Sequence, residues 1–344
     1  MSRTPIQFDG ESLITPELLA ECGSPSSLPK LRDDLLADIT ATLSLIDMRF
    51  RDSANTARVF EDLLLYLHRQ RRSVELDAWV RMVPHLRAHP IAATVRQDPF
   101  TDWSFRKPRG YSGDAHLLDF IYGHPGIEES FQGATGLGRA IYDYTKDAAS
   151  SVAVRERRDL LARLVDAIVA RHGPGTEVLT LAAGHLREAA LSEAFARGQV
   201  GRWVALDQDP LSVSLIRDVY AGTSVEPLDG SVKGYLGDAY DLGRFDLVYA
   251  AGLYDYLPRA VAIKLTRKCM ASLKPGGTFL FANFAEDMLD DAYREIFMNW
   301  DLILRSEADM WDIINNSVDR NTVEASVNAG ENGVILYGSI RKLD

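Results

Sequence analysis

Apolar runs and amphipathic segments alternate along the second half of the chain, from Gly175 onward. Short apolar runs bounded by turn residues predict buried strands, and apolar side chains repeated every three or four positions predict helices between them. This order favours an α/β fold with a mainly parallel sheet, because successive parallel strands need a crossover connection, usually a helix. Such sheets bind ligands at the carboxyl ends of their strands, so we expect the functional site at that edge.

The boundaries of these elements follow from the apolar pattern and the turn residues. The strands that we expect cover residues 177–181, 201–206, 245–250, 277–283, 300–305 and 333–341. Helices are expected over residues 187–197, 210–220, 258–273 and 287–300. We expect the last strands to form an antiparallel edge of the sheet.

The first half of the chain has a different pattern. Its first residues are rich in proline, serine and glycine and lack periodicity, which predicts a flexible lead. Apolar side chains then repeat at helical spacing up to Pro90, residues 98–138 are typical of loops, and a long helix over 138–171 is expected to break near Ser150. We therefore divide the chain into a flexible lead (1–27), a helical cap or lid with a substrate loop (28–150), and an α/β domain (151–344).

Composition narrows the classes of function. The formal net charge of −11 argues against nucleic acid as a partner. Cys22 and Cys269 lie far apart, which favours a reducing compartment, and no run of 18 apolar residues predicts a membrane span, so we expect a cytoplasmic protein. His85 and His89 are four residues apart, but neither a third histidine nor a carboxylate stands beside them, so we predict no metal site. The oligomeric state stays open.

The first strand of the α/β half ends in small residues. Ala182, Ala183 and Gly184 follow it, and small side chains let the backbone approach a ligand closely. Asp207 ends the second strand, 23 residues beyond Gly184 (207 − 184), at about the distance where a carboxylate holds a ribose diol. The alternative is a helix cap, a role that Asp209 fits well because Pro210 follows it.

Later segments add candidate contacts in the same order along the chain. Gly237-Asp238-Ala239 suits an adenine contact through a carboxylate and a backbone N–H. A strand over 245–250 opens into an aromatic loop over 251–257, and Leu273-Lys274-Pro275-Gly276-Gly277 joins a helix end to a buried strand.

Taken together, these segments resemble the class I methyltransferases that use S-adenosylmethionine (SAM), over about residues 150–344. The resemblance implies a Rossmann-like, seven-stranded α/β sheet, here with an N-terminal helical cap, and SAM as the cofactor. Thr180 and Ala182 stand where the family usually has an acidic residue and a glycine. The cofactor contacts that the resemblance implies are Ala182, Ala183 and Gly184 along the methionine portion, Asp207 on the ribose with Gln208 beside it, Asp238 and Ala239 near the adenine, and Ala251.

A narrower resemblance extends into the first half of the chain. The segments at 108–114, 153–158, 250–257 and 282–284 look like a bacterial subgroup that makes methyl esters of 3-hydroxy fatty acids such as 3-hydroxypalmitate. Other members of that subgroup act in specialised metabolism. The fatty acid ester is therefore one candidate product.

Two regions are expected to bind the methyl acceptor. Arg109, Tyr111, Asp114 and His116 cluster in one loop, as a substrate lid or, alternatively, as a hydrogen-bonded linker. Other candidates follow the fourth and fifth strands, where substrates of this fold meet the methyl donor. The candidates for catalysis are Tyr111, His116, Tyr254, Asp255 and Asn283, and those for substrate binding are Arg109, Tyr111, Asp114, Tyr254 and Asn283.

Methyl transfer from a sulfonium is an in-line displacement in which the protein mainly aligns the acceptor and excludes water. An ionised carboxylate needs no general base, whereas a hydroxyl or ammonium would need one, with His116 or Asp255 as candidates. We favour a small, acid-bearing or pre-ionised acceptor that pairs with Arg109. The alternatives are an O- or N-methyltransferase of a natural-product scaffold, a non-catalytic SAM-binding module, and a nicotinamide-dependent oxidoreductase, which the missing GxGxxG disfavours.

Overall fold

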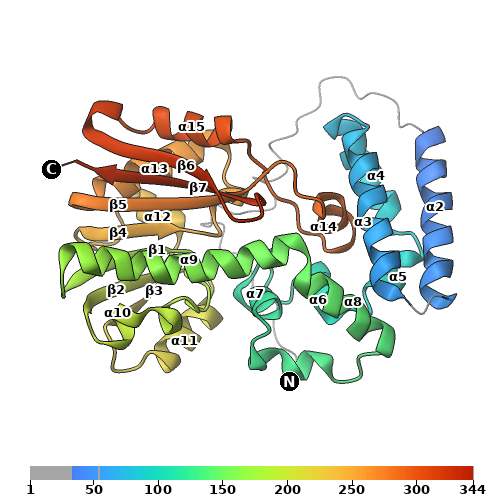
Figure 1. The fold of residues 1–344 in the computed structure, drawn as a ribbon, viewed down its shortest axis with the longest axis horizontal. Coiled ribbons are helices and arrows are strands. Elements are labelled where there is room, and N and C mark those ends of the chain that lie inside the picture. The colour runs from blue at the N-terminus through green and yellow to red at the C-terminus, as the bar shows by residue number, and fades with distance from the viewer. Residues whose placement is uncertain (1–32, 53–54, 344) are drawn as a thin grey trace. The chain divides into compact units, whose positions relative to one another are not determined.

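The computed structural model describes residues 33–52 and 55–343, so the expected flexible lead over 1–27 lies outside the described residues. The chain divides into two compact units (Figure 1). A helical unit contains the described residues up to Val152 together with a second segment, Met288–Asp301. A sheet unit contains Ala153–Asp287 and the chain from Leu302 onward.

The sheet unit contains a seven-stranded sheet in the order β3-β2-β1-β4-β5-β7-β6. The first five strands along the chain are parallel to one another, and β7 is antiparallel to both β5 and β6. This confirms the predicted Rossmann-like α/β fold with an antiparallel edge. The strands are β1 (Thr176–Leu181), β2 (Val200–Asp207), β3 (Val225–Asp229), β4 (Phe245–Ala250), β5 (Leu273–Phe284), β6 (Val323–Ala329) and β7 (Ile335–Lys342).

Strands β3 and β6 were not predicted, and the strand predicted over 300–305 is absent from the structure. β3 contains Pro227, which an edge strand tolerates because one side of its backbone has no partner strand. Residues 300–305 form no strand: Arg305 makes only an isolated bridge to Ala285. Trp300 instead belongs to the helical unit, where the Arg294 guanidinium lies 4.2 Å from its ring centroid.

Helices pack against the sheet, and one of its faces carries an apolar core. Leu179, Val248 and Phe279 lie in this core together with Met310 and Ile313 from the last helix. The predicted helix over 187–197 is only a 3₁₀ turn, η2 (Ala189–Leu191), followed by one helical turn, α10 (Glu193–Ala196). The other elements are α9 (Ala149–His172), α11 (Pro210–Val219), α12 (Val232–Leu236), η3 (Tyr254–Tyr256), α13 (Arg259–Ala271), α15 (Glu307–Asn315) and η4 (Arg320–Thr322).

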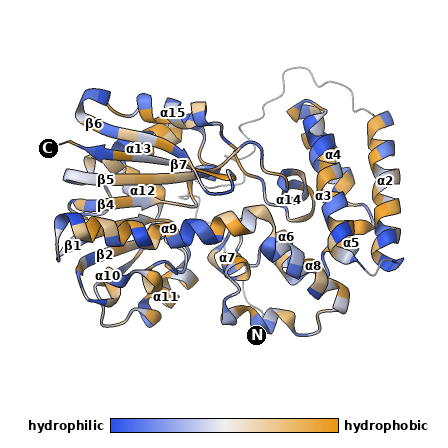
Figure 2. Cartoon of the chain, in the orientation of Figure 1, coloured by the Kyte–Doolittle hydropathy of each residue, from blue (hydrophilic) through white to orange (hydrophobic). Residues whose placement is uncertain are grey.

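The helical unit is built from amphipathic helices (Figure 2). On α3 the buried side chains recur every three or four residues and form one apolar face. The predicted break of the long helix is confirmed, because α8 ends at Asp147 and α9 begins at Ala149. The helices of this unit are α2 (Asp33–Asp52), α3 (Thr56–Arg72), α4 (Leu76–Arg87), α5 (Ile91–Val95), α6 (Pro99–Arg106), α7 (Ala115–Tyr122), η1 (Pro125–Phe131), α8 (Gly136–Asp147) and α14 (Asp291–Phe297).

Helix α14 comes from the second half of the chain, after β5, yet it packs against α3 and α4. Arg294 is only 1% exposed and binds Asp290 at 2.7 Å and the Ser150 hydroxyl at 2.8 Å. The Tyr293 hydroxyl lies 2.8 Å from that of Thr101. The cap expected over 28–150 did not include α14. In the structure, residues 288–301 belong to the core of the helical unit.

Residues 98–138 are more regular than the expected loops. Asp98 is buried and accepts hydrogen bonds from the backbone N–H groups of Phe100 and Thr101, which caps α6. Asp-Pro at a helix start is a local signal that could have predicted this helix. Burial raises the pKa of Asp98 to about 6, although the hydroxyl of Thr101 donates to its carboxylate.

No helix in the described part of the chain is both long and apolar enough to cross a membrane.

Candidate functional site

The turn after β1 has an unusual backbone. Ala182, Gly184 and Leu186 have φ values of 54°, 56° and 51°, so three alternate residues are left-handed. This conformation costs an L-residue about 1–2 kcal/mol, and only glycine adopts it freely. Such strain persists where the surrounding structure holds it, and it concentrates at ligand sites. Ala182 thus has the left-handed backbone that suits a glycine, in the position where the sequence departs from the family pattern.

Asp207 lies against this first turn. Its side chain is buried and accepts hydrogen bonds from the N–H of Gly184 at 2.7 Å and from that of Asp209 at 2.8 Å. The Asp209 carboxylate accepts from the Leu211 N–H at 3.0 Å and from the Ser212 hydroxyl at 2.8 Å. Asp209 therefore caps α11, which is the helix-cap role that the sequence predicted for it. Asp207 joins the ends of β1 and β2 through its two hydrogen bonds.

A buried polar cluster lies beneath the first turn. The Thr180 hydroxyl accepts a hydrogen bond from the Trp203 indole N–H at 2.8 Å. The Tyr249 hydroxyl donates to Glu188 at 2.6 Å. Burial raises the pKa of Glu188, which the hydrogen bond from Tyr249 partly opposes. Glu188 was not among the predicted site residues, because its burial depends on Tyr249, which lies on a strand much later in the chain.

The Gly-Asp-Ala segment ends α12 and is not at the carboxyl edge of the sheet. Asp238 has a left-handed φ of 57°, the N–H of Ala239 donates to Gly234 O at 3.0 Å, and that of Asp238 donates to Tyr235 O at 3.4 Å. These two bonds make a Schellman motif, which uses the N–H expected to face adenine. Asp238 is also exposed and forms an ion pair with Lys268, in the last turn of α13. The adenine role predicted for Asp238 and Ala239 is therefore corrected.

Asp229 was not among the predicted site residues. It ends β3 and pairs with Asp207 in the parallel register of β2 and β3, so both carboxylates lie at the carboxyl edge of the sheet. Asp229 is exposed, and Gln208 beside Asp207 is half-buried. The signal for Asp229 was a strand ending in an acidic residue, which the proline in β3 obscured.

The turn after β4 is more deeply buried than expected. Tyr254 is fully buried in the apolar core, and its hydroxyl lies 2.8 Å from that of Thr266 on α13. Asp255 is 2% exposed and accepts a hydrogen bond from the N–H of Phe284 at 2.7 Å. The structure therefore corrects the predicted roles of Tyr254 as an acceptor contact and of Asp255 as a general base: both side chains hold the turn. Ala251, predicted to contact the cofactor, is only half-buried.

Asn283 is also a structural residue. Its amide donates to Phe284 O at 2.9 Å and to Ile303 O at 2.8 Å, and its side-chain oxygen accepts from Arg305. The side chain is fully buried, so the acceptor contact predicted for it is corrected. A buried polar side chain whose donors and acceptor are all bonded within the fold stabilises that fold.

The candidate loop of the helical unit is partly structural. Asp114 is buried, caps α7 through the Leu117 N–H at 2.9 Å and accepts from the Trp103 indole at 3.0 Å. The His116 ring centroid lies 4.2 Å from that of Trp103. These contacts match the linker alternative for Asp114 and His116. Arg109 lies 3.9 Å from the Asp114 carboxylate, so the loop is brought together locally; Tyr111 is half-buried.

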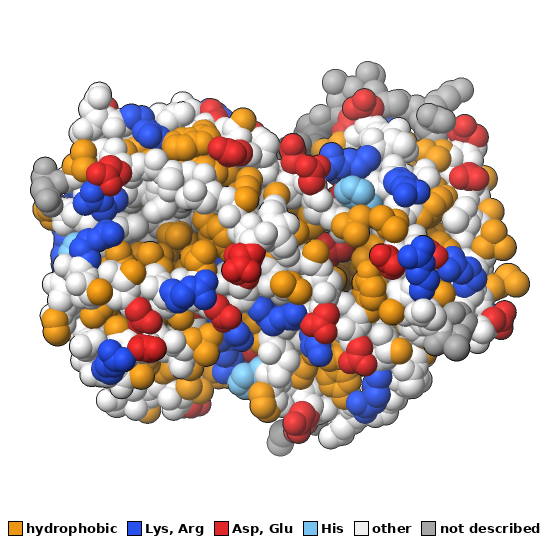
Figure 3. Space-filling view, viewed as in Figure 1, with side chains coloured by type: hydrophobic (Ala, Val, Ile, Leu, Met, Phe, Trp, Pro, Cys, Tyr) orange, Lys and Arg blue, Asp and Glu red, His pale blue; other side chains and the backbone are white. Residues whose placement is uncertain are grey.

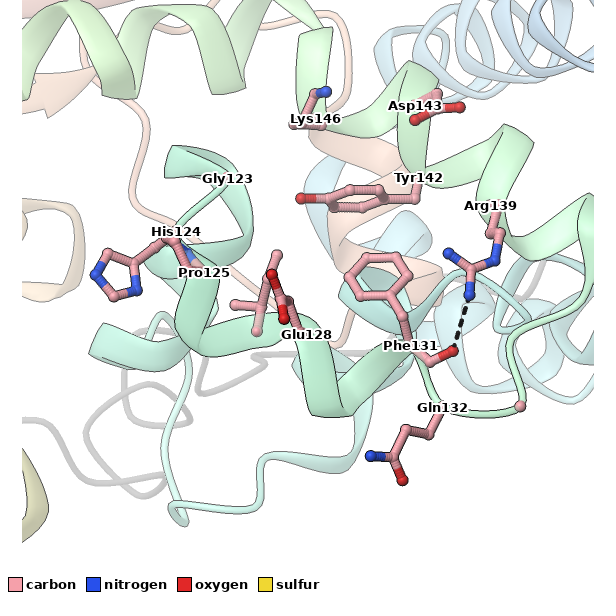
Figure 4. A pocket seen from close by; sticks show the side chains of 12 residues that line it. Gly123, His124, Pro125, Glu128, Phe131, Gln132, Arg139, Tyr142, Asp143 and Lys146 are labelled. Carbon is pink, nitrogen blue, oxygen red and sulfur yellow. Dashed lines mark hydrogen bonds between the residues drawn. The ribbon is translucent and has the colours of Figure 1, made fainter.

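A groove of about 780 Å³ lies within the helical unit, between η1 and α8 (Figure 4). The rings of Phe131 and Tyr142 meet edge to face in its wall, 4.7 Å apart, and Arg139 donates to Phe131 O at 3.2 Å. No residue of the predicted site lines it, and we assign it no role.

Basic and acidic side chains are interspersed over the face seen in Figure 3. Within the described residues, no group of three or more side chains is arranged to hold a metal ion.

No protein-family model and no curated protein matches the chain. Among solved structures, a possible exported protein from Bordetella parapertussis is similar over 93% of this chain and 99% of its own, at 18% identity and a TM-score of 0.54. N-methyltransferase NodS from Bradyrhizobium japonicum, in complex with S-adenosyl-l-homocysteine (SAH), matches 58% of this chain and 90% of its own, at 16% identity and a TM-score of 0.40. Magnesium protoporphyrin IX methyltransferase ChlM from Synechocystis, with bound SAH, matches 67% of this chain and 99% of its own, at 13% identity and a TM-score of 0.43. At these identities, the first similarity shows the fold alone.

Proposed function

We propose that this chain is a class I methyltransferase that uses SAM and acts on a small-molecule acceptor. The observation that carries the proposal is the sheet order, in which the antiparallel β7 lies between β5 and β6. Doubly wound sheets that bind nicotinamide dinucleotides have the order 3-2-1-4-5-6, without such an inserted strand. The inserted strand favours a methyltransferase over the oxidoreductase alternative.

The carboxyl edge of the sheet has groups that fit SAM. The Asp207 carboxylate, bonded to the backbone N–H groups of Gly184 and Asp209, stands at the end of β2, where a carboxylate holds a ribose diol in doubly wound folds. We assign the adenine side to Asp229 and Gln208, and the methionine portion to Ala182, Ala183 and Gly184. Ala251 and Gly252 are small and half-buried, which allows close approach after β4.

In the proposed reaction SAM supplies a methyl group on a sulfonium, and the protein aligns the acceptor and excludes water. Asp255 is buried and bonded to the backbone of β5, which makes it a poor general base. This supports an acceptor that is already ionised, such as a carboxylic acid, because it needs no base. We propose Arg109 and Tyr111 as its contacts, and a 3-hydroxy fatty acid as the first candidate. His116 remains the candidate base if the acceptor is a hydroxyl or an amine of a natural-product scaffold.

Calorimetric titration of the full chain with SAM, SAH and NAD tests the proposal. We expect SAM and SAH to bind and NAD not to bind. NAD binding without SAH binding would overturn the proposal. A second assay follows labelled methyl transfer from SAM to 3-hydroxy fatty acids of increasing length and to hydroxyl- and amine-bearing scaffolds. SAM binding with no transfer to any of these classes would favour the non-catalytic alternative.

A further inference from the structure

A seven-residue turn, Ala251–Leu257, follows β4 at the carboxyl edge of the sheet; we call it the β4 turn. The N–H groups of Tyr256 and Leu257 donate to Leu253 O and Tyr254 O, each at 3.1 Å. These two bonds do not use the carbonyls of Ala251 and Leu257, and Tyr254 O has a second lone pair that can accept a further hydrogen bond. Two buried arginines supply the donors.

Arg305 binds the second half of the β4 turn. Arg305 is only 4% exposed. Its guanidinium donates to Tyr254 O at 2.6 Å and to Leu257 O at 2.5 Å. It also donates to the side-chain oxygen of Asn283 on β5. Burial lowers the pKa of Arg305, and the negative charge of Asp255 opposes this change. A planar guanidinium with five donors can hold several acceptors at once, which a lysine ammonium cannot do in the same geometry.

Arg157 binds the first half of the β4 turn. It lies on α9, is 5% exposed, and donates to Ala251 O at 2.7 Å. A Cβ built on Gly252 would lie 3.7 Å from its guanidinium, so this side chain runs directly beside the turn. Burial raises the pKa of the Glu188 carboxyl, and the positive charge of Arg157 partly opposes this rise.

Burying a guanidinium is costly unless its donors are satisfied and an opposite charge lies close. Both arginines direct their bonds to backbone carbonyls of one turn, although they come from α9 and from the segment after α14. Asp255 joins the same turn to Phe284 N on β5 and, through its own carbonyl, to Ile303 N at 2.7 Å. The half-buried residues of this turn are Ala251 and Gly252, which the proposed function places beside the cofactor.

We propose that Arg157 and Arg305 are positioning residues that hold the β4 turn in the shape required for cofactor and acceptor binding. The inference rests on the proposed function for its ligand, but the rigidity of the turn is testable without one. A turn that is already ordered loses little conformational freedom on binding, so ligand affinity should depend on both arginines.

Hydrogen exchange of the full chain, measured by mass spectrometry without ligand, tests the rigidity. In Arg305→Met we expect the amides of Tyr256 and Leu257 to exchange at least 10-fold faster than in the wild type, and in Arg157→Met those adjoining Ala251. Exchange in β1 and β2 should not change. The Lys variant at each position should recover part of the protection, because it restores the charge and one donor. Arg267→Met is the matched control, since Arg267 also donates to a backbone carbonyl, Asn316 O at 2.7 Å, but is exposed.

Titration with SAH then tests the positioning role. We expect SAH affinity to fall by about 10-fold in the Met variants, to recover partly in the Lys variants, and to stay at the wild-type value in Arg267→Met. If a Met variant does not fold, the Lys variant alone decides, by faster exchange confined to the turn. Unchanged exchange in the turn, or an SAH affinity equal to that of the wild type, would overturn the inference. A turn that loosens in a protein whose wild type binds no SAH would instead overturn the proposed function.

Discussion

Asp207 offers the sharpest test of the cofactor site, through the isosteric change Asp207→Asn. In the wild type both carboxylate oxygens accept from backbone N–H groups, of Gly184 at 2.7 Å and of Asp209 at 2.8 Å. The variant replaces one of these oxygens by an NH₂ group. One N–H in this buried site then faces another donor and loses its partner.

The magnitude follows from the two bonds. Hydrogen bonds to a charged group contribute about 1.5–3 kcal/mol each and neutral ones about 0.5–1.5, so the loss of charge costs roughly 2 kcal/mol over two bonds. An unsatisfied buried N–H adds about 1–3 kcal/mol. We expect the free energy of unfolding to fall by about 3–5 kcal/mol. If Asp207 also binds the ribose, weakening that contact by about 1.4 kcal/mol lowers SAH affinity roughly 10-fold.

Asp209→Asn is the matched control, because it makes the same charge change two residues away, also at a buried site. Asparagine caps a helix about as well as aspartate, so its cost should be below about 1 kcal/mol and SAH affinity should not change. Urea denaturation and calorimetric titration with SAH measure the two quantities. Wild-type SAH affinity in Asp207→Asn, or an equal loss in both variants, would refute the ribose assignment.

Three further predictions concern the backbone and one buried acid. Ala182→Gly should raise the free energy of unfolding by up to about 1 kcal/mol, because relief of left-handed strain (about 1–2 kcal/mol) exceeds the entropic cost of glycine (about 0.5–1 kcal/mol). Ala183→Gly should lower the free energy of unfolding. Urea denaturation that shows a loss of stability in both variants would contradict this prediction. Asp238→Gly should keep wild-type SAH affinity and stability within about 1 kcal/mol, because glycine fits the helix end and the exposed ion pair contributes little; a 10-fold weaker SAH titration would restore its adenine role. The folded pKa of Asp98 is raised to about 6, above its unfolded value of about 3.9, so its contribution to stability is full below pH 4 and is lost as pH rises through 6. In the wild type, Asp98 should lower the free energy of unfolding by on the order of 2–3 kcal/mol as the pH rises through that window. Asp98→Asn should remove this dependence on pH, and an unchanged dependence in the variant would rule out Asp98 as its source.

Sequence patterns predicted the features that depend on neighbouring residues. The alternation after Gly175 predicted the α/β fold, because each strand and helix has its own periodicity. The roles of Asp207 and Asp209 could be separated because a helix cap requires only the first turn of its own helix. β3 escaped detection because Pro227 is unfavourable within a strand unless that strand lies at the edge, and sheet order alone decides which strand does.

Other features were decided only in the tertiary structure. Tyr254 and Asn283 stand at strand ends, where polar side chains often face a ligand, but Arg305 and Thr266 reach them from distant segments and complete their hydrogen bonds inside the fold. The pattern over 287–300 predicted a helix in that segment, yet not that its residues would build the core of the helical unit. An amphipathic pattern specifies that one face is buried, whereas the partner surface depends on which segments the rest of the chain brings there.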